Sequence, residues 1–275
     1  MLLKIAEIFG RHVDDGTAEA KNSRKRKICP FRHAQCNKGN IDDPLGICSF
    51  GNENQATVVC PSRFLEGEQI FRDAGRLAFG SKRSVAAIPE IRVLKVEVFG
   101  GKSRRIGKID FMLAVLDMNG KPIDFAALEV QAVYISGRSI RPAFDQYLKN
   151  GSLPTGSERR PDFRSSAQKR LMPQLSLKVP IFRRWGKKFF VVVDQTFFNE
   201  LPKMPTVAGI ENSEVTWLVY PFDKRDSVVK IGEPKVVYTL WDAVMNALRE
   251  GAAPIPSEIL SELEGNLSRG TIVRT

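Results

Sequence analysis

The sequence predicts an α/β fold, with a mixed β-sheet core flanked by helices and a small cysteine-containing module near the N-terminus. Three observations lead to this prediction. A helical pattern over residues 66–79 precedes three strand-like segments, a further helical stretch and a buried type of strand. All four cysteines of the chain fall within residues 28–64, which are rich in turn-forming residues. Hydrophobic residues make up 43% of the 275 positions, enough to bury a sizeable core.

The first 27 residues predict a short amphipathic helix over residues 1–10, then a polar stretch ending in the basic run Arg24 to Lys27. No long apolar region and small-residue cleavage site follow, so a signal peptide is not expected. No apolar run approaches the roughly 20 residues that span a bilayer. We therefore expect a cytoplasmic protein without a membrane partner. We divide it into residues 1–64, the helix and cysteine module, and residues 65–275, the core with its C-terminal DNA-binding and dimerisation elements.

The central region predicts a meander of three strands. The alternation of Ile88–Phe99 is typical of a strand, and Gly100-Gly101 ends it. Two more strands, Lys108–Asp117 and Ile123–Ile135, are joined through Asn119-Gly120, a strong hairpin signal because both residues tolerate positive φ. The hairpin therefore brings polar residues of the two strands together.

The C-terminal half alternates further helices and strands. Ser165–Arg184 is predicted to be helical, with interruptions or kinks at Pro173 and Pro180. The remaining predicted elements are a buried strand at Phe189–Val193, a strand at Glu214–Pro221, and helices near Thr239–Arg249 and Ser257–Leu263.

The cysteines predict a metal site. Cys29, Cys36, Cys48 and Cys60 lie close together in the sequence, and a reducing compartment would keep them as thiols. Four thiolates complete a tetrahedral shell around zinc or iron, which would order a segment so poor in apolar residues. The shell would be closed, so its role would be structural. The alternative is four unconnected cysteines buried as small hydrophobic residues.

Two acidic residues mark the candidate catalytic site. Asp110 lies on one predicted strand of the hairpin, and Glu129 and Gln131 lie on the other, two residues apart and therefore on one face. Carboxylates within apolar strands are costly unless they are paired or bind metal, and Mg²⁺ prefers oxygen ligands. The alternative is a pair of ordinary exposed acids. Glu97, on the preceding strand, is a candidate third acid, although it could pair with Lys95 or Arg104 instead.

The charge of the chain favours a polyanionic partner. Lys and Arg exceed Asp and Glu by 42 to 31, which gives a net charge of +11. Residues 151–188 carry ten Lys or Arg against two acids. The candidate DNA contacts within this segment are Arg159, Arg160, Arg164, Lys169 and Arg170. A solvated charged face is the alternative.

Together these residues resemble a known family. The Asp…Glu-x-Gln arrangement is similar to the PD-(D/E)xK nuclease motif, with Gln131 where Lys is usual. Residues 27–31 and 59–64 resemble the cysteine segment of the NotI restriction endonucleases. The resemblance implies a restriction-endonuclease-like core, Asp110, Glu129 and Gln131 as catalytic residues, and the four cysteines as ligands of a structural iron. The residues themselves leave iron and zinc both open.

We therefore expect a type II restriction endonuclease that hydrolyses double-stranded DNA with Mg²⁺ held by Asp110 and Glu129. By resemblance, its target is a GC-rich palindrome, and a palindrome favours a homodimer. Two alternatives stay open. One is a repair or structure-specific nuclease on the same fold, which would cut DNA without sequence selectivity. The other is a metal-stabilised DNA-binding protein that performs no chemistry.

Overall fold

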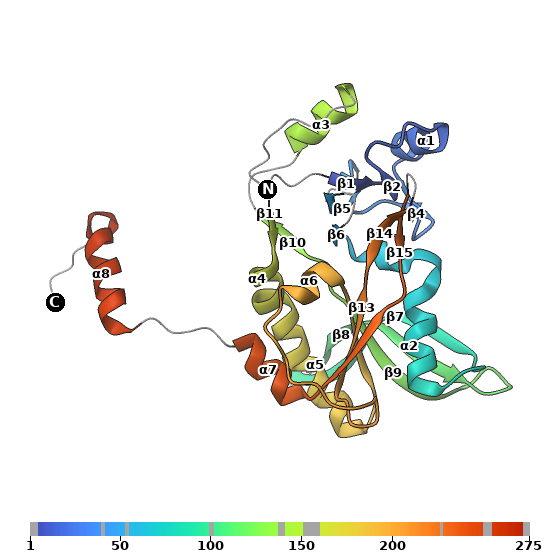
Figure 1. The fold of residues 1–275 in the computed structure, drawn as a ribbon. Coiled ribbons are helices and arrows are strands. Elements are labelled where there is room, and N and C mark those ends of the chain that lie inside the picture. Colours follow the sequence, from blue (N-terminus) through green and yellow to red (C-terminus); the bar gives the residue numbers. More distant parts are fainter. Residues whose placement is uncertain are drawn as a thin grey trace.

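The computed structural model describes residues 5–39, 42–52, 55–98, 102–136, 141–150, 160–225, 228–249 and 255–271 (Figure 1). Within these residues, none of the helices is both long and apolar enough to cross a membrane. The predicted break at Gly100-Gly101 and the candidate DNA contact Arg159 lie outside the described ranges.

A six-stranded mixed sheet forms the centre of the molecule. Its strands, in spatial order, are β16 (Lys235–Thr239), β13 (Val215–Tyr220), β12 (Phe189–Asp194), β9 (Pro122–Val130), β8 (Lys102–Leu116) and β7 (Val85–Val98). Strand β12 runs parallel to both of its neighbours, and the other pairs are antiparallel. The predicted α/β fold with a mixed sheet is therefore confirmed.

Helices cover both faces of this sheet (Figure 1). Helix α2 (Gln69–Phe79) packs on the face that receives Phe190 and Val192. Helices α5 (Met172–Trp185) and α7 (Trp241–Arg249) pack on the other face, together with Val191 and Val193. Successive residues of β12 are thus buried in opposite layers, as the period-2 geometry of a strand requires. The apolar run of β12 is explained by burial on both faces.

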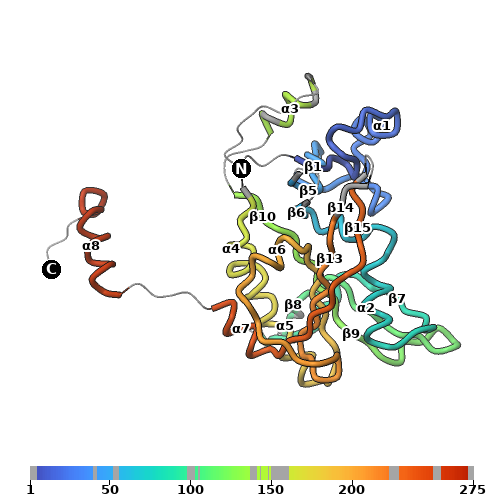
Figure 2. Tube along the Cα trace, in the orientation of Figure 1, coloured from blue at the N-terminus to red at the C-terminus, as the bar shows by residue number. Residues whose placement is uncertain are grey.

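The N-terminal part forms a second, smaller sheet. Its strands lie in the order β2 (Arg11–His12), β1 (Ile5–Ile8), β5 (Ile47–Asn52) and β6 (Gln55–Val58). Beside it are α1 (Ala18–Arg26) and the short pair β3 (Ile28–Cys29) and β4 (Ala34–Gln35). The module lies next to the hairpin of β14 (Phe222–Arg225) and β15 (Val228–Ile231) (Figure 2).

The predicted helix over residues 1–10 is wrong for the part that the structure describes, because Ile5–Ile8 is a strand. All four residues of β1 are buried, including Glu7, so an amphipathic helix with one polar face does not fit. Strand β5 pairs with β1 across 39 to 45 positions of sequence, a contact that a local pattern does not contain.

The remaining elements are η1 (Pro61–Glu68), β10 (Tyr134–Ser136), α3 (Arg141–Asn150), β11 (Arg160–Asp162), α4 (Phe163–Ser165), η2 (Ser166–Leu171), α6 (Gln195–Asn199), α8 (Pro256–Asn266) and η3 (Leu267–Arg269). Among them, η2 and α8 coincide with predicted helical segments, whereas α3, β11 and α6 were not predicted. The predicted strand over residues 123–135 is divided, since β9 ends at Val130 and β10 pairs with β11 instead. Pro180 lies inside α5 without ending it. In the β8–β9 turn, Gly120 has positive φ and Asn119 does not.

Candidate active site

Asp110 and Glu129 lie where strands β8 and β9 stop pairing. The last pair of this end of the ladder is Phe111 with Leu128. Beyond it, Oδ2 of Asp110 accepts a hydrogen bond of 2.9 Å from the backbone N–H of Val130. Oε1 of Glu129 accepts a longer bond of 3.4 Å from the backbone N–H of Asp110. Each carboxylate therefore binds the opposite strand, and the two groups are brought together as the hairpin predicted.

The two carboxylates differ in their environment. Asp110 is half-buried and lines a cleft, whereas the side chain of Glu129 is 2% exposed. Burial, and secondly the negative charge of Asp110, raise the pKa of Glu129 to about 8. A cation placed between the two groups would oppose this shift, because it favours the ionised form.

Lys178 is a third charged residue of the site, and sequence reasoning did not identify it. Its Nζ lies 2.7 Å from Oε2 of Glu129 and 3.3 Å from Oε1 of Gln174. The side chain comes from α5 and is only 5% exposed. One signal could have found it: Lys178 lies on the helix face of Leu175, Val179 and Phe182, where a core residue is expected.

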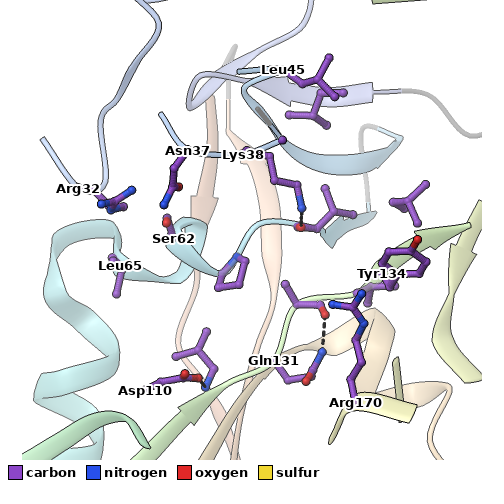
Figure 3. A pocket seen from close by; sticks show the side chains of 18 of the residues that line it. Arg32, Asn37, Lys38, Leu45, Ser62, Leu65, Asp110, Gln131, Tyr134 and Arg170 are labelled. Atoms are coloured by element: carbon purple, nitrogen blue, oxygen red, sulfur yellow. Dashed lines mark hydrogen bonds between the residues drawn. The ribbon is translucent and has the colours of Figure 1, made fainter. Parts of the chain in front are cut away.

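Gln131 lies just beyond the end of β9. Its backbone N–H donates a hydrogen bond of 2.9 Å to the carbonyl of Val192 in β12, so the pairing with that strand extends to Gln131. Its side-chain Nε2 donates to the carbonyl of Ala132 at 2.6 Å. Strand β9 ends at Val130, so a shared face of Glu129 and Gln131 stays a prediction. Gln131 nevertheless lines the cleft with Asp110 (Figure 3).

The structure does not bring Glu97 to this site. Glu97 is exposed and pairs with Ser103, seven residues along β8 from Asp110. At about 3.3 Å per residue, that separation is roughly 23 Å. Glu90 is the acid of β7 that lines the cleft. It has a φ of 64°, a left-handed conformation that is uncommon for a non-glycine residue, and it pairs with Lys108 at 2.7 Å.

The cleft lies between strands β8 and β9 and the cysteine module. Its volume is about 1140 Å³, and Gln174 from the core is part of its wall. Asp110 and Gln131 line it from the same side (Figure 3). Arg32, Asn37 and Lys38 face it from the module. The Lys38 ammonium donates to the carbonyl of Val59, and burial lowers its pKa.

Among the described basic residues of the predicted DNA-binding segment, Arg170 is the one that lines this cleft. Its guanidinium lies 4.4 Å from the ring centroid of Tyr134. Arg164 and Lys169 are exposed nearby on α4 and η2. Arg160 lies in β11, opposite Ser136. The cleft thus has cationic side chains on both walls, a surface suited to a polyanion.

The four cysteines are buried in the module and form no disulfide. Burial is the main cause that raises the pKa values of Cys29, Cys36 and Cys48. Within the described ranges, no group of three or more His, Cys, Asp or Glu is arranged closely enough to hold a metal. Four buried thiols in one module are still a suitable set of donor types for a soft metal.

Two acids at the end of a strand pair, beside a cleft with basic walls, define a class of site suited to phosphodiester hydrolysis. The family model described as "Restriction endonuclease NotI" matches residues 7–230. The chain belongs to the NotI family of restriction endonucleases, which are site-specific deoxyribonucleases. A search of curated proteins finds no match.

Proposed function

We propose that this restriction endonuclease hydrolyses phosphodiester bonds of double-stranded DNA at a specific sequence, with Mg²⁺ held by Asp110 and Glu129. The observation that carries the proposal is the fixed pair of carboxylates at the end of the β8–β9 ladder. Asp110 opens to the cleft, where a scissile phosphate would lie. Bound Mg²⁺ would activate water and stabilise the charge that develops on the phosphate.

The protein groups have separate roles in this proposal. Asp110 and Glu129 offer hard oxygen ligands, and the carbonyl of Val130 would supply a third oxygen. Gln131 has no ionisable group, so it orients water or a phosphate oxygen by hydrogen bonding. Glu90 of β7 lies opposite Asp110 of β8 in the strand register, and both residues line the cleft. Glu90 would be a further acid at this site.

We also propose that Cys29, Cys36, Cys48 and Cys60 bind one structural iron or zinc ion. Their burial in one module and their closeness in the sequence support this assignment. Metal–sulfur distances near 2.3 Å would require the thiols to move closer together than they are in the structure. Such a site would order the loop that presents Arg32 and Lys38 to the cleft.

DNA would contact the cationic walls of the cleft, namely Arg32, Lys38 and Arg170, and the exposed Arg164 and Lys169. A second basic surface is the β7–β8 ribbon. Its residues 91–108 carry six Lys or Arg against one acid, and the ribbon extends past Asp110. By resemblance, the target is a GC-rich palindrome.

A palindromic target favours a homodimer, because a two-fold assembly presents one active site to each strand. Helix α8 supports self-association, since its apolar residues are exposed: Ile259, Leu260, Leu263 and, just after it, Leu267. A double change of Leu260 and Leu263 to Gln should shift the protein towards the monomer in light scattering after gel filtration. An unchanged dimer would remove α8 from the interface.

Plasmid digestion tests the proposed activity. Wild-type protein with Mg²⁺ should produce discrete fragments, and sequencing of their ends would give the target. Asp110→Asn and Glu129→Gln should remove cleavage while binding DNA normally, and Asp242→Asn, at a 78% exposed side chain, is the matched control. A smear would indicate a nuclease without sequence selectivity. Binding without cleavage in any divalent ion would indicate a DNA-binding protein.

A further inference from the structure

Lys178 occupies a place where a lysine is costly unless it has a function or a partner. It is 5% exposed and lies among the apolar residues of α5, while Arg183 and Arg184 of the same helix are exposed. Burying an ammonium group costs several kcal/mol in free energy if it is unpaired. The compensating partner is Glu129, 49 residues earlier in the chain. This pair is therefore formed by the tertiary fold and not by helix propensity.

The contact divides the two oxygens of Glu129 between different partners. Oε2 faces Lys178 at 2.7 Å, and Oε1 faces the backbone of Asp110 at 3.4 Å. Gln174, one helical turn before Lys178, accepts from the same ammonium and lines the cleft. The rotamer of Glu129 is thus set from the side of α5, away from the open cleft.

Lys178 also provides a charge that the end of β9 lacks. Gln131 is neutral, and its side-chain amide is engaged with the carbonyl of Ala132. Among the described residues, Lys178 is the cationic side chain that donates a hydrogen bond to the carboxylate pair, and it donates to Glu129. The other hydrogen bonds to these two carboxylates come from backbone N–H groups. The helix that carries it follows directly on the π-helical turn η2, a type of distortion that is frequent at functional sites.

We propose that Lys178 is a positioning residue for the cleavage reaction, which holds Glu129 in its ligating rotamer and supplies the positive charge that Gln131 cannot. The inference rests on the proposed function, because it assigns Glu129 to metal binding. Lys178 does not line the cleft in the described structure, so it acts through Glu129 and not on the DNA. A partner of this kind typically changes metal affinity or activity about 10- to 100-fold when it is removed.

The test compares wild-type protein with Lys178→Met, which keeps the length of the side chain and removes its charge. Mn²⁺ binding is measured by calorimetry without DNA, and cleavage is measured in single turnovers at saturating metal. We expect Mn²⁺ affinity and cleavage rate each to fall about 10- to 100-fold. DNA affinity in Ca²⁺ should stay at the wild-type value. Binding and cleavage equal to wild type would overturn the inference.

Two further variants separate positioning from folding. If Lys178→Met does not fold, Lys178→Gln, which keeps a donor without the charge, is measured against the same expectations. In the background of Lys178→Met, the change Gln131→Lys places a cation at the neighbouring motif position and should recover at least about tenfold in rate. If the cleavage rate of this double variant does not recover, the inference that Lys178 supplies the charge lacking at Gln131 is overturned. Absence of Mg²⁺-dependent cleavage by wild-type protein would instead overturn the proposed function.

Discussion

The Nε of Arg63 lies 2.9 Å from Oε1 of Glu7, and both side chains are almost completely buried. The same guanidinium donates to Glu66 at 2.7 Å and to the carbonyl of Val229 at 2.8 Å. Ser49 donates to the second oxygen of Glu7. One arginine therefore joins strands of the cysteine module to η1 and to the β14–β15 hairpin.

Removal of Arg63 should destabilise the whole protein. Arg63→Ala leaves Glu7 buried without its cation, which costs about 3–5 kcal/mol in the free energy of unfolding. Urea denaturation followed by circular dichroism would measure the loss. Arg76→Ala is the matched control, because that arginine is exposed and its ion pair with Asp73 contributes at most about 1 kcal/mol. Equal effects of the two changes would contradict the assigned role of Arg63.

The cysteine site predicts bound metal. Purified protein should contain about one iron or zinc ion per chain by elemental analysis, and visible absorption would distinguish iron, since zinc is silent. Cys36→Ser and Cys48→Ser should lose the metal and melt at lower temperature, because metal binding is coupled to folding. Ser62→Ala, close to Cys60 in the sequence, is the control. Metal-free wild-type protein of unchanged stability would rule the site out.

The basic segment predicts a change in the salt dependence of DNA binding. Combined changes of Arg164, Lys169 and Arg170 to Gln should lower the slope of log affinity against log salt by about one for each phosphate that is no longer neutralised. Fluorescence anisotropy with a duplex at several salt concentrations would measure it. Matched changes at the exposed Lys203, Lys230 and Lys235, which are outside the cleft lining, should leave the slope nearly unchanged. Identical slopes in both sets would place the DNA elsewhere.

Asp194 predicts a specific dependence of stability on pH. It is fully buried at the start of α6, and burial raises its pKa from 3.8 to about 7 even though backbone N–H groups, chiefly that of Phe197, oppose the shift. Between these two values the folded state binds a proton that the unfolded state has lost. The contribution of Asp194 to stability is therefore full below about pH 4 and falls as the pH rises towards 7.

Denaturation of wild-type protein and Asp194→Asn across this pH range would isolate that contribution. The difference in unfolding free energy should change in favour of the variant as the pH rises, because the amide does not titrate. Parallel curves would show that the pKa of Asp194 is not raised in the folded state.

Local patterns were sufficient to predict the parts of the fold that depend on neighbours in sequence. The β8–β9 hairpin has a strong turn signal, and it alone brings Asp110 and Glu129 together. Strand β12 is a continuous apolar run, which the burial of both faces explains. These elements needed no knowledge of distant partners.

The errors concern residues whose environment is set from far along the chain. Glu7 gave residues 1–10 an amphipathic appearance, but it is buried because Arg63 neutralises it. Lys178 was counted among the basic residues of a candidate DNA-binding segment, although its partner is Glu129. Glu97 was placed near the catalytic pair because strand order was predictable and the length of the β7–β8 ribbon was not.

The hydrogen bonds from Val130 to Asp110 and from Asp110 to Glu129 have a practical consequence for preparing inactive enzyme. Alanine at Asp110 or Glu129 would remove the acceptor of a hydrogen bond between the two strands. A loss of cleavage could then come either from the missing carboxylate or from local disorder of the strands. Asparagine and glutamine keep a carbonyl oxygen for the same N–H groups. Asp110→Asn is therefore the appropriate variant for capturing an uncut DNA complex, because it changes the charge of the site, keeps the hydrogen bond between the strands and leaves the ion pair of Glu129 and Lys178 intact.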